Sequence, residues 1–378
     1  MFAHFGHHLA TAAAVPLLPM IRQEFGLDYF RSGLLLSAFS ITYGFCQLPM
    51  AAVSDRVSKR VVISLGLVGT GVACVGAGMA GSYPMLLLAL ALMGVAGSTY
   101  HAPASSFLSQ TFGKEGRGRS LGLHIVGGTS GLMAAPLLSI VIANLTGSWR
   151  YAFISMGAPI LLIGVLVWSL ARDQETVNIR ASAGEKAEPV RLFEVVRLLG
   201  VLVAIALLTQ LLVSGVNSFL PLFLVDKHGT SQEMGGLMLG LVYGAGVIGA
   251  PLGGALSDRF GRKPIILLTV VLIGPLILMI TQLSFGPAMA VVIAVYGVVI
   301  VFRLPAIESL IADLIPAQRR ATVLGGYYFL SQETTGIITP LMGWLLDQHG
   351  IDSGFRIIAF MGIGCSLLSV AIWKRALR

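Results

Sequence analysis

Residues 254–263 read GALSDRFGRK, a short charged stretch between two long apolar ones. Residues 51–60 read AAVSDRVSKR and hold a related stretch nearer the N-terminus, again flanked by apolar residues. Asp55 and Asp258 are 203 positions apart (258 − 55), which is about half of the 378 residues. A charged stretch between apolar runs long enough to cross a bilayer predicts a tight turn between two membrane helices. The spacing of the two copies predicts a chain made of two similar halves.

The composition is typical of an integral membrane protein. Hydrophobic residues make up 56% of the chain and charged residues 11%, and the mean hydropathy is +0.86. Soluble domains carry roughly 25% charged residues. Helices that are apolar on every side leave no face for water, so the composition argues against a soluble all-α protein.

Apolar stretches of membrane-spanning length cover nearly the whole sequence. The predicted spans are twelve in number: 3–22, 32–54, 61–81, 84–111, 118–145, 151–171, 199–226, 232–257, 264–284, 287–314, 321–346 and 354–374. The first span begins almost at Met1 and lacks the basic leader of a cleavable signal peptide. We therefore interpret it as a retained helix, and a natural start slightly upstream of Met1 is left open.

Lys and Arg residues are distributed unequally between the two sides of the predicted membrane. Of the 25 such residues, 19 fall after even-numbered spans, in the central polar stretch or at the C-terminus, and five fall on the opposite side. Basic residues accumulate in cytoplasmic loops, so we expect both termini in the cytoplasm of a bacterial-type cell. The net charge of +8 follows from this bias. It does not indicate a nucleic-acid partner, because no basic patch is interleaved with aromatic residues.

The similarity between the halves extends beyond the two charged turns. Residues 100–106, YHAPASS, resemble residues 302–308, FRLPAIE, at an offset of 202. The most polar part of the chain lies between the halves. We predict an N-terminal six-helix bundle over 1–172, a cytoplasmic linker over 173–198 and a C-terminal six-helix bundle over 199–378.

The charged turn resembles the loop Gly-x-x-x-Asp-Arg-x-Gly-Arg-Arg/Lys between the second and third helices of the major facilitator superfamily. Residues 254–263 match it nearly fully, whereas residues 51–60 lack both glycines. The resemblance implies an all-α integral membrane protein of twelve transmembrane helices in two pseudo-symmetric six-helix bundles. It further implies a secondary active transporter that works by alternating access and binds its substrate near the midplane between the bundles.

The resemblance also implies that the charged turns lock the cytoplasmic side in the outward-open state. A carboxylate at the C-terminal end of its helix is repelled by the helix dipole, so another element has to hold Asp258. The predicted gating residues are Asp55, Arg56, Gly254, Asp258, Arg259, Arg262, Lys263 and Glu308, the last from its place near the cytoplasmic end of its span. The alternative is a solvated basic turn that only sets the topology.

Polar residues recur on single faces of several predicted spans. Gln210, Ser214 and Asn217 follow the spacing of one helix face, and polar groups in a span usually face the bundle interior. The predicted substrate-binding residues are His8, Tyr43, His101, Gln210, Asn217 and Arg303. Interhelical hydrogen bonds are the alternative explanation for any one of them.

Arg303 is the one basic residue well inside a predicted span. Its cost in a bilayer, at least about 2.5–3.5 kcal/mol on insertion scales, favours a functional role. Three roles are open: a ligand for an anionic part of the substrate, an ion pair with a buried carboxylate such as Glu333, and a cytoplasmic gate.

Protons are the predicted coupling ion. Glu333 lies well inside its span, where burial favours a protonated carboxyl, and His124 changes charge near neutral pH. A permanently neutral or ion-paired structural carboxyl is the alternative for Glu333. His4 and His8 could hold a metal, but span 1 offers no thiolate or carboxylate beside them, so we predict no metal and no cofactor.

Nothing in the sequence indicates an enzyme or an ATP-driven pump. Gly244-x-Gly246-x-x-Gly249 matches a dinucleotide fingerprint but lies inside an apolar span, so we interpret it as helix packing. The expected protein is a monomeric transporter of a small solute. Residues 100–105 resemble a stretch of fosmidomycin-resistance-type drug exporters; uptake of a small organic anion and a non-transporting receptor or partner protein are the alternatives.

Overall fold

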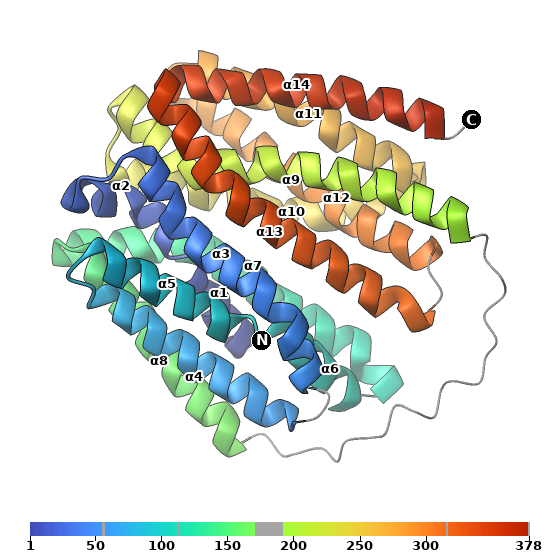
Figure 1. The fold of residues 1–378 in the computed structure, drawn as a ribbon, viewed down its shortest axis with the longest axis horizontal. Coiled ribbons are helices and arrows are strands. Elements are labelled where there is room, and N and C mark those ends of the chain that lie inside the picture. Colours follow the sequence, from blue (N-terminus) through green and yellow to red (C-terminus); the bar gives the residue numbers. More distant parts are fainter. Residues whose placement is uncertain (55–56, 112, 171–191, 315–316, 377–378) are drawn as a thin grey trace.

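A computed structural model describes residues 1–378 except 55–56, 112, 171–191, 315–316 and 377–378 (Figure 1). The described residues form helices only. Those of the N-terminal half are α1 (Phe2–Thr11), α2 (Ala14–Phe25), α3 (Tyr29–Ser54), α4 (Lys59–Gly78), α5 (Tyr83–Gly97), α6 (His101–Thr111), α7 (Gly113–Thr146) and α8 (Trp149–Leu170).

The described part of the C-terminal half has six helices. They are α9 (Leu192–His228), α10 (Gln232–Phe260), α11 (Arg262–Gln282), α12 (Pro287–Leu314), α13 (Ala317–His349) and α14 (Ile351–Ala376). α9 begins before residue 199, so the end of the predicted linker is helical. The rest of that linker lies outside the described residues, and the proposed domain division stays a prediction.

Two predicted spans are each divided into two helices. Residues 3–22 correspond to α1 and α2, and residues 84–111 correspond to α5 and α6. α2 and α6 each begin two residues before a proline, Pro16 and Pro103. Proline fits the first turn of a helix, but its missing N–H and its ring prevent continuation from the preceding turn. Pro16 and Pro103 therefore account for the two breaks. The twelve-span fold is confirmed, with spans 1 and 4 each interrupted.

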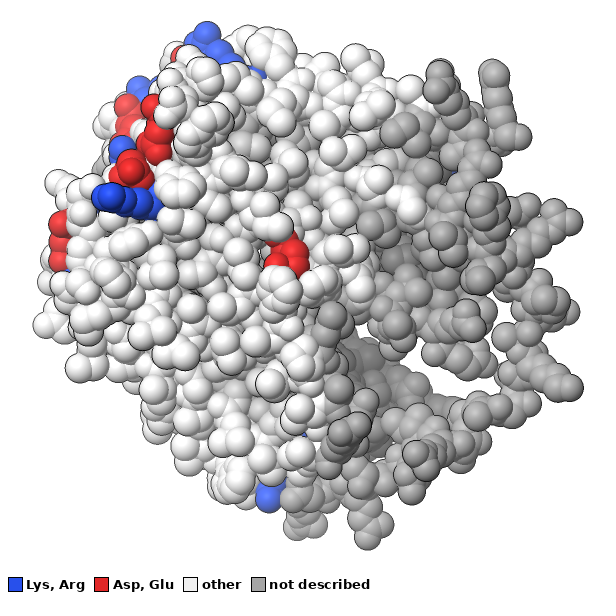
Figure 2. All heavy atoms as spheres, viewed as in Figure 1, with Lys and Arg blue, Asp and Glu red and all other residues white. Residues whose placement is uncertain are grey.

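The described surface fits a lipid environment. By length and apolar composition, 8 of the described helices could cross a membrane. The remaining predicted spans are the two divided ones together with α3 and α13. On the face that Figure 2 shows, the described Lys, Arg, Asp and Glu gather mostly at one end and leave a largely uncharged surface elsewhere.

Glycines allow helices within the C-terminal half to approach each other closely. A Cβ on Gly249 of α10 would lie 2.5 Å from the carbonyl oxygen of Val298 on α12, and one on Gly297 would lie 2.4 Å from that of Val242. No side chain fits at these distances, so both positions require glycine. The interpretation of the Gly244–Gly249 motif as helix packing agrees with this geometry.

The two halves meet along α3 with α13 and along α7 with α10. In the first pair, Ser37 donates a hydrogen bond to the Gly336 carbonyl over 2.5 Å, and a Cβ on Gly33 would lie 2.7 Å from the Thr339 carbonyl oxygen. In the second pair, Ile140 of α7 fits against Gly236. These contacts lie toward the end of the molecule that carries the α2–α3 and α9–α10 loops, opposite the C-terminus in Figure 1. The described halves are therefore joined at that end, which we call the closed end.

Candidate functional site

A group of histidines lies inside the N-terminal half. α1 contributes His4 and His8, and His101 is the first residue of α6, directly after the break in span 4. The nearest ligand atoms of these three imidazoles all lie within 4.8 Å of one another. Their ring centroids are separated by 4.8 Å for His4–His8, 5.0 Å for His4–His101 and 5.2 Å for His8–His101. Two predicted substrate-binding residues, His8 and His101, are thus neighbours.

Further rings pack around this group. His124 of α7 stacks on His4 with centroids 3.9 Å apart, and His7 stacks on Tyr100 at 4.9 Å. His4, His7 and His124 are 6%, 1% and 5% exposed, so all three are buried. Tyr43 of α3, also buried, lies with its ring centroid 6.3 Å from that of His101. The predicted proton-carrying His124 therefore belongs to the same cluster as the predicted substrate ligands.

Arg303 organises a polar network in the C-terminal half. Its side chain is 3% exposed. It donates one hydrogen bond to the Tyr327 hydroxyl over 3.1 Å and one to Oε1 of Gln210 over 2.7 Å. The amide of Gln210 in turn donates to Ser214 and Thr335 over 3.0 and 3.1 Å. The structure thus brings Arg303 of α12 and Gln210 of α9 together, with neutral partners on α13.

Asn217 lies farther along the same face of α9. Its Oδ1 accepts a hydrogen bond from the Tyr296 hydroxyl over 3.1 Å. Tyr296 is fully buried on α12. Asn217 is therefore tied to the α9–α12 contact through Tyr296.

Glu333 is not an ion-pair partner of Arg303 within the described residues. Its side chain, 8% exposed, lies on α13 against α3 of the other half. A Cβ on Gly44 would lie 2.1 Å from Oε1 of Glu333, so the carboxyl occupies the space that this glycine leaves. Oε1 has no hydrogen-bond partner among the described atoms. The internal pair considered from the sequence is not formed here, and Glu333 belongs to the contact between the halves.

Charged groups join the two halves at the closed end. Arg22, at the end of α2, forms an ion pair with Asp226 of α9, and the Tyr29 hydroxyl donates to the same carboxylate over 2.6 Å. Burial, followed by the hydrogen bond to Asp226, raises the pKa of Tyr29, so its phenol stays the donor. Arg22, Tyr29 and Asp226 were not predicted from the sequence, because polar and charged residues at span ends are common in any membrane protein.

Asp347 forms a second link across the closed end. Its two carboxylate oxygens accept hydrogen bonds from the backbone N–H groups of Tyr29 and Phe30, each over 2.9 Å. The last turn of α13 therefore caps the first turn of α3, a helix of the other half. A carboxylate at a helix N-terminus is favourable both as a hydrogen-bond acceptor and as a charge.

Local contacts hold the charged turn at 254–263. Asp258 is 72% exposed and pairs with Arg262 one helical turn away, and Arg262 also donates to the Ser257 carbonyl over 3.1 Å. The guanidinium of Arg259 lies 5.2 Å from the centroid of the Phe260 ring. The stabilisation that we expected for Asp258 thus comes from its own turn in this conformation.

Gly254, one of the predicted gating residues, does not mark a close helix approach, because a Cβ there would meet Pro305 at 3.9 Å, an ordinary contact. Gly253 is the position of close approach, because its Cβ would lie 2.6 Å from the Phe302 Cα. Lys263 lies in the first turn of α11, and Asp55, Arg56 and the side chain of Glu308 lie outside the described residues.

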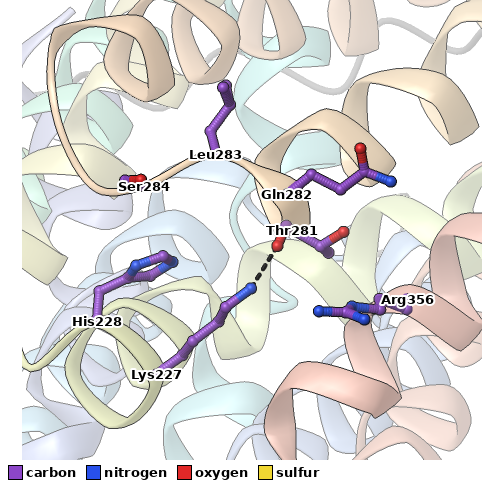
Figure 3. A pocket seen from close by; sticks show the side chains of 7 residues that line it. All are labelled: Lys227, His228, Thr281, Gln282, Leu283, Ser284 and Arg356. Atoms are coloured by element: carbon purple, nitrogen blue, oxygen red, sulfur yellow. Dashed lines mark hydrogen bonds between the residues drawn. The ribbon is translucent and has the colours of Figure 1, made fainter.

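A hollow at the closed end is lined by none of the predicted site residues. It is lined by Lys227, His228, Thr281, Gln282, Leu283, Ser284 and Arg356 (Figure 3). The ammonium of Lys227 is bound by the Thr281 carbonyl and by Asp352, the latter over 2.5 Å. Asp352 also pairs with Arg356 over 2.7 Å. Lys227 and Arg356 thus share one carboxylate, so these three groups together carry one net positive charge.

Two helical bundles with buried polar groups on both sides of their contact define a multi-pass membrane transporter of small solutes. The chain belongs to the Major Facilitator Superfamily, whose family model matches residues 1–332 and 202–377. It is not an enzyme.

Several characterised relatives span nearly the whole chain. The fosmidomycin resistance protein of Escherichia coli K12 is 24% identical over 95% of this chain and 88% of its own. The hexuronate transporter of Bacillus subtilis 168 is 24% identical over 93% of this chain and 88% of its own.

Solved structures share the fold. The inward-facing, occupied structure of a bacterial homologue of the human lysosomal transporter Spinster has a TM-score of 0.84 at 18% identity, and it covers 100% of this chain and 95% of that one. The nucleoside transporter NupG has a TM-score of 0.77 at 12% identity, covering 99% and 97%. The expected superfamily fold is confirmed.

Proposed function

We propose that this protein is a proton-coupled secondary active transporter of a small organic anion, with Arg303 as the group that binds the anion. Arg303 supports this proposal most directly. Its guanidinium is buried, its Nε has no partner among the described atoms, and its two described hydrogen bonds go to the neutral side chains of Tyr327 and Gln210. Neutral partners satisfy donors but leave the charge uncompensated in a medium of low dielectric constant.

A carboxylate, sulfonate or phosphonate would supply the missing charge. Guanidinium binds such groups with two parallel hydrogen bonds, a geometry that an ammonium group does not reproduce. In this superfamily the substrate lies near the midplane between the halves, and Arg303 and Gln210 come from two helices of the C-terminal half that carry the predicted site. Asn217 and the cluster of Tyr43, His8 and His101 complete the proposed polar wall.

The names of several relatives support an anionic substrate. Among them are the hexuronate transporter of Bacillus subtilis, a probable L-galactonate transporter of Escherichia coli and a probable sulfoacetate transporter of Cupriavidus necator, at 24%, 28% and 27% identity. Each of these names denotes an organic acid. Export of a drug is the second candidate function, because the fosmidomycin resistance protein matches 95% of this chain.

Glu333 is the proposed proton carrier, with His124 as a second titrating group. The carboxyl lies in the contact of α3 with α13, which has to separate when the closed end opens. A protonated carboxyl tolerates this buried contact better than an ionised one, because burial of a charge is costly. Loss of the proton would therefore favour separation of the halves, and this couples the proton to the conformational cycle.

The conformation follows from the orientation that we propose. The basic-residue bias puts both termini in the cytoplasm of a bacterial inner membrane, so the closed end faces the periplasm and the molecule is inward-facing. The charged turn at 254–263 would then engage the other half only in the outward-open state. In this conformation Asp258 pairs with Arg262, one helical turn away. In the outward-open state we expect this turn to contact the other half instead.

A binding assay on purified protein tests the anion proposal. A thermal-shift screen with hexuronates, aldonates and short sulfonates should identify a stabilising anion for the wild-type protein, because a ligand at 100 times its Kd stabilises by about 2.7 kcal/mol. Arg303→Lys keeps the charge but loses the planar pair of donors, so we expect affinity to fall by about tenfold or more.

Arg356→Lys is the matched control, since Arg356 is a paired arginine at the closed end, outside the proposed site. It should bind the anion as the wild type does. Full affinity in Arg303→Lys, or an identified substrate that is a cation with no anionic group, would show that Arg303 is not an anion ligand.

A further inference from the structure

His4, His7, His8, His101 and His124 form one cluster, although they come from three helices, with His101 directly after the break in span 4. Organic anion transport needs polar groups there, but it does not explain why all five should be imidazoles. The cluster also holds three buried ring nitrogens without a hydrogen-bond partner among the described residues: Nε2 of His4, Nδ1 of His7 and Nε2 of His124. Such groups are costly in an apolar interior.

The tautomer of His4 follows from its one strong contact. Nδ1 lies 2.6 Å from the backbone carbonyl oxygen of His124. A carbonyl only accepts hydrogen bonds, so Nδ1 carries the proton and, in a neutral ring, Nε2 carries the lone pair. A carbonyl that holds the other ring nitrogen is the usual support of a metal-binding histidine. His4 is thus oriented with a free, buried lone pair.

Two other imidazoles lie beside the His4 ring. One ligand atom each from His4, His8 and His101 falls within 4.8 Å of the others. Nitrogens bound to one tetrahedral zinc ion at about 2.1 Å lie about 3.4 Å apart, so a metal would have to draw these atoms closer together. His4 and His8 are one helical turn apart on α1, and His101 opens α6 immediately after a break in the helix.

We propose that His4, His8 and His101 bind one divalent transition-metal ion. Three imidazoles suit Zn²⁺, Cu²⁺, Ni²⁺ or Co²⁺, whereas Mg²⁺ and Ca²⁺ prefer oxygen ligands. Three neutral histidines leave a fourth position open, and a water, hydroxide or anion there would offset part of the ion's charge. We predicted no metal from the sequence because span 1 offers no thiolate or carboxylate; in the proposed site His101 of α6 is the third ligand instead. This proposal does not depend on the proposed organic-anion substrate.

Metal titration of the purified protein tests the site. The protein is prepared with a tag that contains no histidine, stripped with a chelator and titrated with Zn²⁺ by calorimetry and with Co²⁺ by visible absorption. We expect one tight site per chain and the intense absorption of four- or five-coordinate Co²⁺. His8→Gln and His101→Gln each remove a direct ligand, so the affinity for Zn²⁺ should fall by about 100-fold or more, beyond the effect of losing a supporting contact.

His349→Gln is the matched control, because His349 is exposed at the end of α13 and lies outside the cluster. It should bind Zn²⁺ like the wild type. Equal affinity in His8→Gln, His101→Gln and His349→Gln, or absence of saturable binding by the wild type, overturns the proposal. X-ray absorption of the zinc-loaded wild type covers the case in which a variant does not fold: three imidazole ligands support the site, and a shell of oxygen or sulfur ligands contradicts it.

Discussion

Tyr327 and Gln210 hold the buried guanidinium of Arg303 in one orientation. Both are neutral, so they position the cation without cancelling its charge, and an anion remains free to do so. A carboxylate in place of either side chain would form a stable ion pair with Arg303, and the site would then bind an anion more weakly. The choice of partners at this residue is thus consistent with a ligand and not with a permanent internal pair.

Tyr327→Phe tests this positioning role. The change removes the acceptor of one Arg303 hydrogen bond and keeps the aromatic ring, so the guanidinium gains freedom and one donor is left unsatisfied. A hydrogen bond of this kind is worth about 1 kcal/mol, and we expect about fivefold weaker binding of the anion found in the thermal-shift screen. Tyr83→Phe is the control, because its hydroxyl donates to the Arg31 carbonyl, outside the proposed site. Equal loss of affinity in the two variants would count against the role of Tyr327.

Single residues of the site could be predicted from the sequence only in part. The spacing of Gln210, Ser214 and Asn217 and the isolation of Arg303 in a span identified polar positions of the C-terminal half. The partners Tyr327 and Thr335 could not be found, because they lie on α13 and a tyrosine or threonine in a span has no distinctive signal. The convergence of His4 with His101 and His124 likewise depends on how α1, α6 and α7 pack.

Among the elements, α10 and α12 show why the apolar spans contain so many glycines. Because Gly249 and Gly297 have no side chain, the backbones of α10 and α12 can approach each other closely. Dispersion contacts between close backbones hold membrane helices together where no hydrophobic effect acts between them. The span boundaries were predictable within a few residues, while the breaks before Pro16 and Pro103 were not, since proline is also tolerated inside membrane helices.

Gly249→Ala tests the α10–α12 contact. The added Cβ would lie 2.5 Å from the Val298 carbonyl oxygen, so the helices have to move apart, and overpacking of this kind costs about 1–3 kcal/mol. We expect a lower melting temperature of the purified protein in detergent. Gly364→Ala on α14 is the control, because no atom lies within 4 Å of its added Cβ. Equal melting temperatures for the two variants would contradict the close packing.

The cap that α13 places on α3 holds the closed end together. Asp347→Ala removes both hydrogen bonds to the Tyr29 and Phe30 amides, and loss of a helix cap costs about 1 kcal/mol. We expect the population to shift toward the state in which the closed end is open. Spin labels at Gln23 and Gln232, which lie 3.4 Å apart between their amide atoms across the halves, should report longer distances.

Asp28→Ala is the control for this shift, because Asp28 accepts from the Arg31 N–H within the same half. Its removal weakens the start of α3 without cutting a link between the halves. An unchanged distance distribution in Asp347→Ala, or the same shift in Asp28→Ala, would show that the cap does not control opening.

For the molecule as a whole, the proposed alternating access requires two conformations, and the structure is assigned to one of them. The halves are joined at the closed end by Arg22–Asp226, by Asp347 and by the α3–α13 contact that holds Glu333. Alternation requires these contacts to break while others form at the opposite end. The two-bundle architecture could be inferred from one repeated turn, but the closing residues could not, because the turn marks the other end of the molecule.

Transport of the identified anion into proteoliposomes under an imposed pH gradient tests whether protons drive transport through Glu333. Wild-type protein should accumulate the anion when the gradient is present. Glu333→Gln, which mimics a permanently protonated carboxyl, should lose accumulation but still exchange labelled for unlabelled anion. Glu24→Gln, at the closed end, should accumulate it normally. Accumulation by Glu333→Gln at the wild-type level, or wild-type transport that does not respond to the pH gradient, would contradict proton coupling through Glu333.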